Sequence, residues 1–157
     1  MTEPGPSQLK STLRADLHIS MRERDQLRSS TLRMALTAVT NEEVSGTKAR
    51  ELTDDEVLKV LSREAKKRRE AATAYIEAKR PELAATEEAE LAILEAYLPA
   101  QLSDVEVQAL VAQAIKDTGA SGMPQMGTVM KAATALAAGR AEGGRIAAMV
   151  RSALAAE

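Results

Sequence analysis

A glycine- and arginine-rich turn near the end of the chain is the segment whose residue types best suit anion binding. It reads Gly-Arg-Ala-Glu-Gly-Gly-Arg over residues 139–145. Glycines beside a helix start let backbone N–H groups converge on a phosphate, and the positive end of the helix dipole adds attraction. The candidate RNA-binding cations on and around this turn are Lys131, Arg140, Arg145 and Arg151. The pattern predicts a phosphate-binding turn between two helices.

Three further observations limit what this turn can be. It has no Gly-Lys-Ser/Thr ending and no strand before it, so it is not a P-loop. Gly139 as a helix C-cap and Gly143-Gly144 as a helix entry would also explain the glycines without any ligand. The only aromatic residues are Tyr75 and Tyr97, so the tail offers no platform for base stacking. An RNA held here would be recognised by the shape and charge of its folded backbone.

A second run of cations lies in the middle of the chain. Lys66, Lys67, Arg68 and Arg69 are consecutive, and they are further candidate RNA contacts. Four consecutive residues span a full helical turn, so their side chains cannot all face one way. A solvated helix face is the competing interpretation of this run.

Residues that could carry out catalysis or hold a metal are scarce. His18 is the only histidine and there is no cysteine, which excludes disulfides, thiolate chemistry and zinc–sulfur sites. The acidic residues fall at helical spacings that do not bring carboxylates together, so an active site would need carboxylates from distant parts of the chain. We predict no catalytic residue, no metal site and no cofactor.

Charge is distributed in blocks that the net charge of −2 conceals. Residues 63–80 hold seven basic and three acidic side chains, whereas residues 82–106 hold seven acidic and no basic ones. Residues 107–157 hold five basic and three acidic. Any affinity for a polyanion must therefore come from local clusters of cations.

The elements that position these residues are predicted to be helices. Hydrophobic residues make up 45% of the chain, and the near absence of aromatic side chains leaves a core of aliphatic residues, methionine and alanine. Apolar residues recur at three- and four-residue steps, which favours an all-α fold of about seven helices. The stripes expected to face inward include Met21 of the first helix, Leu27 of the second, Tyr75 or Ile76 of the third and Leu136 of the sixth.

Local signals place several helix ends. Thr53 to Glu56 and Ser103 to Glu106 match the capping box that starts a helix. Pro99 is expected to end the fourth helix, and Gly119 is expected to close the fifth in a left-handed conformation. The sixth helix is expected to start near Ser121, with Pro124 in its first turn.

These signals predict two domains after a short disordered segment. Residues 1–8 are expected to be disordered, residues 9–98 to form an N-terminal domain of about four helices, and residues 103–157 to form a C-terminal three-helix domain. The N-terminus lacks the basic and apolar parts of a signal peptide, and no apolar run approaches the roughly 18 residues of a membrane span. We therefore expect a cytoplasmic protein that does not associate with a membrane.

Several segments resemble the GatB/YqeY family, and in particular the YqeY-like proteins. The most specific is Glu88-Ala-Glu-Leu-Ala-Ile-Leu-Glu-Ala-Tyr-Leu-Pro99, followed by Gln101-Leu-Ser103. The others are Thr31-Leu-Arg-Met34, Asn41-Glu-Glu43, Glu51-Leu-Thr-Asp54, Gly127-Thr-Val-Met130 and Gly139-Arg-Ala141. The resemblance covers nearly the whole chain from about residue 9.

The resemblance implies a small all-helical protein whose C-terminal domain is similar to the tail of the B subunit of the tRNA-dependent amidotransferase. In that enzyme the tail helps to hold tRNA, while the amide-forming chemistry lies in a separate portion that has no counterpart here. Relatives often carry more lysines where this chain reads Ala132 to Ala138 and Ala147 to Met149.

Three functions follow as hypotheses. The first is a non-catalytic tRNA-binding or aminoacylation-associated module. The second is a protein-interaction adaptor, with a tRNA synthetase or an amidotransferase subunit as partner. The third, supported by kinship alone, is a component of a carbon–nitrogen ligase that uses glutamine as amide donor.

Overall fold

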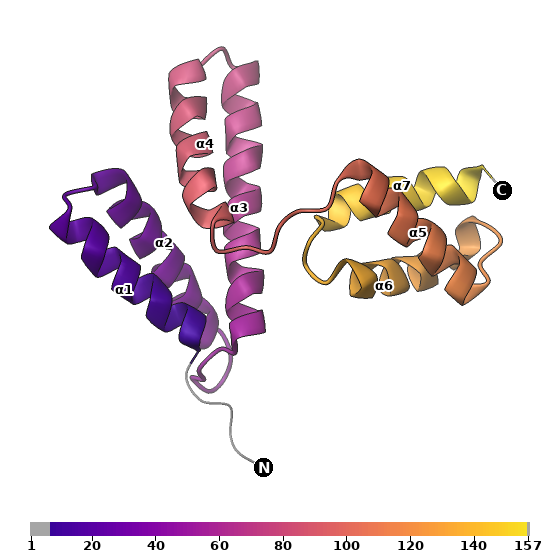
Figure 1. Cartoon of the computed structure of the whole chain (residues 1–157), viewed down its shortest axis with the longest axis horizontal. Helices are drawn as coiled ribbons and strands as arrows, with labels where there is room; N and C mark the ends of the chain where they lie inside the picture. Colours follow the sequence, from indigo (N-terminus) through magenta and orange to yellow (C-terminus); the bar gives the residue numbers. More distant parts are fainter. Residues whose placement is uncertain (1–6, 157) are drawn as a thin grey trace. The chain divides into compact units, whose positions relative to one another are not determined.

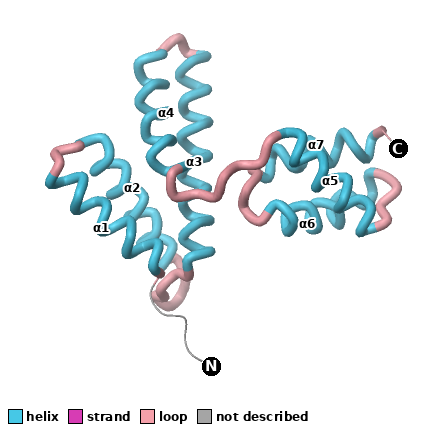
Figure 2. Tube along the Cα trace, viewed as in Figure 1, coloured by secondary structure: helices cyan, strands magenta, loops and turns pink. Residues whose placement is uncertain are grey.

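The computed structural model describes residues 7–156, and in that range it contains seven α-helices, one short 3₁₀ helix and no strand (Figures 1 and 2). The predicted all-α fold is confirmed. Residues 1–6, most of the segment predicted to be disordered, lie outside the described residues. None of the described helices combines the length and the apolar character needed to cross a membrane. The described residues up to Leu98 pack as one compact unit, and those from Pro99 onward pack as a second.

The first unit consists of two helical hairpins (Figure 1). Its helices are α1 (Gln8–Arg22), α2 (Gln26–Glu43), α3 (Asp54–Glu77) and α4 (Pro81–Glu95). The aliphatic faces of all four meet in one core, whose largest fully buried side chains are Leu13, Leu32, Val39, Leu52, Val57, Leu61 and Leu94. The aliphatic composition therefore yields a closely packed helical core, as the periodicity predicts.

Carboxylates tie the start of α1, the end of α2 and the start of α3 together. Asp54 accepts hydrogen bonds from the Ser7 hydroxyl and from the backbone N–H of Leu9. Glu43, which is buried, pairs with Lys10 at 2.6 Å and accepts from the backbone N–H of Leu52. Helical structure thus begins at Gln8, capped by the buried Ser7, inside the segment predicted to be disordered.

The second unit is a three-helix domain. It contains α5 (Asp104–Thr118), the 3₁₀ helix η1 (Met123–Gln125), α6 (Met126–Ala137) and α7 (Gly143–Ala155). Each α-helix contributes a stripe to a core that shares no residue with the first, and its buried members are Val107, Val111, Ala114, Ala120, Val129, Ala133, Ala137, Ile146, Val150 and Leu154.

Both capping boxes are confirmed. The Thr53 hydroxyl accepts from the N–H of Glu56, and the Ser103 hydroxyl accepts from the N–H of Glu106, while each glutamate accepts in return from the backbone N–H of its capping residue. Gly119 closes α5 in the left-handed region at φ +67°. These ends depend on contacts within four residues, which explains why the sequence predicts them.

Two helix boundaries differ from the prediction. α4 ends at Glu95 rather than beside Pro99, because the N–H groups of Tyr97 and Leu98 turn back to carbonyls three residues earlier. The sixth helix starts at Met126, since the segment around Pro124 tightens into η1 instead of the first α-helical turn.

Three apolar side chains expected to face inward are substantially exposed. The exposed fraction is 47% for Met21, 38% for Leu27 and 47% for Leu136. Each of them is the second or the second-last residue of its helix. Of the pair Tyr75 and Ile76, Tyr75 is the half-buried member.

Candidate nucleic-acid interface

The turn between α6 and α7 is held against the segment that leads into α5. The backbone N–H of Leu102 donates to the carbonyl of Arg140 at 2.7 Å, and the Nε of Arg140 donates to the carbonyl of Ala100 at 3.0 Å. Ala138 and Gly139 occupy the left-handed region at φ +48° and +77°, and this reverses the chain. These contacts fix the backbone of Arg140 and the Nε atom of its guanidinium.

Arg145 is anchored to the same segment. Its Nη2 donates to Oδ1 of Asp104 at 2.8 Å, and the Arg145 side chain is 34% exposed while that of Asp104 is 78% exposed. Exposed pairs of this kind stabilise a fold only slightly, so a phosphate can replace the carboxylate at small cost. The structure thus brings Arg140 and Arg145 to one edge of the second unit, beside residues 100–104.

The start of α7 lies between these two arginines in the sequence. Gly143 and Gly144 form its first residues, and the side chain of the N-cap residue Glu142 makes no capping hydrogen bond. Open space surrounds the positions where side chains would stand on both glycines. Backbone N–H groups at a helix start, together with nearby guanidinium groups, form an arrangement that suits a phosphate oxygen.

The other two cations predicted for the tail are not joined to this edge by any contact in the described residues. Lys131 is exposed in the middle of α6, about 9 Å along the helix axis from its last residue. Arg151 is exposed on α7, about 9 Å beyond Arg145 and turned roughly 120° away from it. The edge is therefore defined by Arg140, Arg145 and the start of α7, and we call it the tail turn.

The basic run of the first unit is divided between surface and interior. Arg68 is only 5% exposed, and its Nη1 donates to Glu64 at 2.6 Å while its Nε lies 3.5 Å from Glu90 across the α3–α4 interface. Lys66, Lys67 and Arg69 are more exposed, and they pair with Glu70, Glu64 and Glu95. Arg68 thus has a structural position, and the four cations do not share one surface.

The two carboxylates beside Arg68 are shifted in opposite directions. Burial opposes ionisation of Glu64, but the hydrogen bonds from Lys67 and Arg68 outweigh it and lower the pKa of this carboxyl. Burial and the nearby Glu87 raise the pKa of Glu90, since its contact with Arg68 is longer. Arg68 is thus bound mainly to Glu64.

His18 and Tyr97, the other side chains with potential for chemistry, belong to the first unit. His18 is exposed on α1 in the first unit. Within residues 7–156, no three or more histidine, aspartate or glutamate side chains are grouped so that they could hold a metal ion. Burial and a hydrogen bond to Asp16 raise the pKa of Tyr97 to about 12, which keeps this phenol protonated and structural.

Comparison with known proteins identifies one family. A family model described as Yqey-like protein matches residues 10–154, which includes both units almost completely. No curated protein matches the chain.

Proposed function

Because the chain belongs to the family of YqeY-like proteins, we propose that its second unit is a non-catalytic tRNA-binding module. The tail turn is the proposed contact with the phosphate backbone. The observation that carries this proposal is the convergence of Arg140 and Arg145 on residues 100–104, next to the start of α7. The resemblance to the amidotransferase B-subunit tail supports the choice of tRNA.

The donors available at the tail turn favour a phosphate. In the described structure Arg140 uses only its Nε within the protein, and Arg145 uses only its Nη2. The remaining guanidinium nitrogens can donate in pairs to phosphate oxygens. Such contacts position an RNA without reading its sequence.

The composition of the second unit limits the affinity. Residues 99–157 hold five basic and five acidic side chains, so the domain has no net charge. The binding energy must come from the local cluster, and it must compete with Asp104 for Arg145. We therefore propose moderate, salt-sensitive binding to folded RNA, in the cytoplasm, and we assign no amide-forming chemistry to this chain.

A gel-retardation experiment with mixed tRNA and the full chain tests the proposal. We expect the variant Arg140→Gln/Arg145→Gln to lower both the affinity and the salt dependence, with the log–log slope reduced by about one for each lost contact. The charge-matched control Lys116→Gln/Arg151→Gln removes two cations from the same unit away from the tail turn.

Two results would refute this function. One is the absence of any complex at micromolar protein and low salt. The other is an equal loss of affinity in the control, since this would indicate general electrostatic attraction rather than a site. Circular dichroism of each variant shows whether the fold is intact.

One observation favours a protein-interaction adaptor as a second candidate. Val105 is 74% exposed near the start of α5, and Met123 is 45% exposed in η1 of the same unit. Exposed apolar side chains on a small domain are candidates for partner contact. Recovery of the wild-type chain with a synthetase or amidotransferase subunit, and loss of that partner in Val105→Ser, would support this function.

A further inference from the structure

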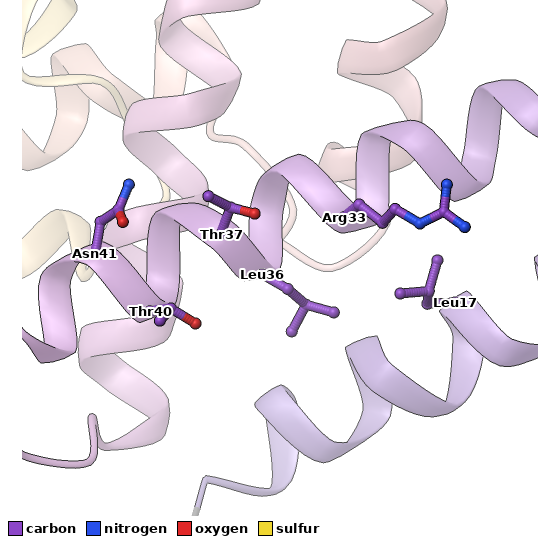
Figure 3. A pocket seen from close by; sticks show the side chains of 6 residues that line it. All are labelled: Leu17, Arg33, Leu36, Thr37, Thr40 and Asn41. Carbon is purple, nitrogen blue, oxygen red and sulfur yellow. The ribbon is translucent and has the colours of Figure 1, made fainter.

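The hairpin of α1 and α2 has a groove along its outer seam (Figure 3). The groove has a volume of about 370 Å³, and its lining consists of Leu17 from α1 with Arg33, Leu36, Thr37, Thr40 and Asn41 from α2. Figure 3 shows the guanidinium of Arg33 reaching toward Leu17 on the opposite helix. The lining contains one cation, two hydroxyls, one amide and no carboxylate.

The carboxylates of the hairpin are mostly engaged elsewhere. Asp16 accepts from the hydroxyl of Tyr97, Asp25 caps α2, Glu42 pairs with Arg63, and Glu43 pairs with Lys10. Glu23, at the end of α1, is the one hairpin carboxylate without such a contact in the described residues. The acidic side chains are thus largely neutralised by the rest of the first unit.

Four arginines of the same hairpin have no acidic partner in the described part of the chain. Arg14 and Arg22 lie on α1, Arg24 lies in the turn and Arg33 lies on α2, and all four are exposed. Because most carboxylates of the hairpin are paired and these arginines are not, its outer face is positively charged. The hairpin therefore has local positive charge although the whole protein is slightly acidic.

The spacing of the α1 residues places this charge in a row beside the groove. Arg14, His18 and Arg22 follow one another at four-residue steps, so each lies about 6 Å along the axis from the next. Arg14 precedes Leu17 by three residues and therefore neighbours the groove. A second hollow, of about 520 Å³, is lined by His18, Met21 and Arg22. The two hollows are lined by consecutive residues of α1, Leu17 and His18.

We propose that this surface, the basic hairpin face of Arg14, Arg22, Arg33, Thr37, Thr40 and Asn41, binds the phosphate backbone of RNA. The proposal rests on the proposed function only for the choice of tRNA as the RNA. Arginine, threonine and asparagine side chains are common donors to phosphate and sugar oxygens. A row of separated cations suits a polymer with regularly repeated negative charge.

An acidic protein helix fits this surface less well. Docking of a helix requires an apolar pocket that takes an anchoring side chain. Leu17 and Leu36 are already half-buried by the hairpin, and the other side chains of the groove lining are polar.

The test measures binding of mixed tRNA to the full chain at about 50 and 200 mM salt. We expect Arg14→Gln/Arg22→Gln/Arg33→Gln to weaken binding about tenfold at the lower salt and to reduce the log–log salt slope by about one for each lost contact. The control Lys48→Gln/Lys59→Gln/Lys79→Gln removes the same charge from exposed positions of the same unit. It should lose much less affinity.

Three outcomes would overturn the inference. The first is wild-type affinity and salt slope in the triple arginine variant. The second is an equal loss in the lysine control. The third is displacement of labelled tRNA from the wild type by poly-glutamate at lower charge concentration than by unlabelled tRNA, which would indicate an acidic polypeptide as the occupant.

The experiment separates this inference from the proposed function. If only the tail-turn variant loses affinity, the function of the second unit stands and the basic hairpin face does not bind RNA. If only the triple arginine variant loses affinity, the hairpin face binds RNA and the tail-turn proposal fails. Melting curves of all variants confirm that the exposed substitutions leave the fold intact.

Discussion

Adjacent arginines with the same chemistry have different roles in this protein. Arg68 is buried between α3 and α4 and donates to Glu64, whereas Arg69 is about one-third exposed and pairs with Glu95 at 3.5 Å. The difference follows from helical rotation, since successive residues point about 100° apart. Arg68 is therefore a structural residue inside a run that resembles a nucleic-acid patch.

Removal of Arg68 is predicted to destabilise the first unit strongly. Arg68→Met leaves the partly buried Glu90 without its cation and the buried Glu64 with only the exposed Lys67, and loss of one partner of a buried pair costs about 3 kcal/mol. Urea unfolding followed by circular dichroism measures this cost. The exposed pair of Arg69 predicts a loss of at most about 1 kcal/mol for Arg69→Met.

A double variant distinguishes charge from packing at this site. Arg68→Met/Glu64→Gln removes one of the two carboxylates that face the missing guanidinium, so it should regain part of the stability that the single variant loses. Equal stability of Arg68→Met and the wild type would show that the ion pair is dispensable.

At the tail turn, the residue types are predictable from sequence but their contacts are not. The composition of the turn indicates phosphate binding, with Arg140 and Arg145 as candidate contacts. Their anchors, Ala100 and Asp104, lie 40 and 41 residues earlier in the chain. Such contacts depend on tertiary packing, which no local pattern encodes. For the same reason, the sequence alone does not predict that Arg14, Arg22 and Arg33 lack an acidic partner in the described part of the chain.

At the scale of helices and turns, a feature is predictable from the sequence when it depends on residues close to it in the chain. The all-α fold, both capping boxes and the left-handed Gly119 depend on neighbours within one or two turns, and the structure confirms them. The early end of α4 and the replacement of a helical turn by η1 depend on how the chain enters and leaves its unit. Left-handed Ala138 also escapes prediction, because alanine rarely adopts that conformation.

In the α6–α7 turn, the same substitution, glycine to alanine, can be made separately at two positions with different backbone conformations. Gly139 has φ +77° and Gly143 begins α7, while neither has an atom near the position of an added Cβ. Gly139→Ala should therefore destabilise the protein by about 1 kcal/mol through backbone strain alone. Gly143→Ala should stabilise it by up to about 1 kcal/mol, since alanine loses less entropy in a helix.

Thermal unfolding of the full chain compares these two variants directly. Shifts of opposite sign are expected for the transition of the second unit. Shifts of the same sign would contradict the conformations assigned to this turn. The effect on tRNA affinity then shows whether the strained backbone of the turn matters for binding.

At the scale of the whole molecule, the chain consists of two units with separate cores. The core around Leu61 in the first unit and the core around Leu154 in the second have no residue in common. Both are built almost entirely from leucine, valine, isoleucine and alanine, since the protein has only two aromatic residues. Each proposed RNA-binding surface lies entirely on one unit, so each function can be tested by variants of that unit.

The separate cores predict that each unit can be destabilised independently. Leu61→Ala removes a fully buried side chain from the first core, and Leu154→Ala removes one that is 2% exposed from the second. Loss of a buried leucine side chain costs about 2–5 kcal/mol, because it removes apolar contacts and leaves a cavity. Hydrogen exchange measured by peptide reports the opening free energy of each unit in the full chain.

In Leu61→Ala, faster exchange should be confined to peptides from residues 7–98, and in Leu154→Ala it should be confined to residues 99–156. Wild-type protection of the other unit serves as the internal control in each variant. Faster exchange throughout the chain in either variant would show that the units unfold as one cooperative body. Independence would instead permit the tail turn to be studied on the isolated second unit, where the basic hairpin face is absent and cannot contribute to RNA binding.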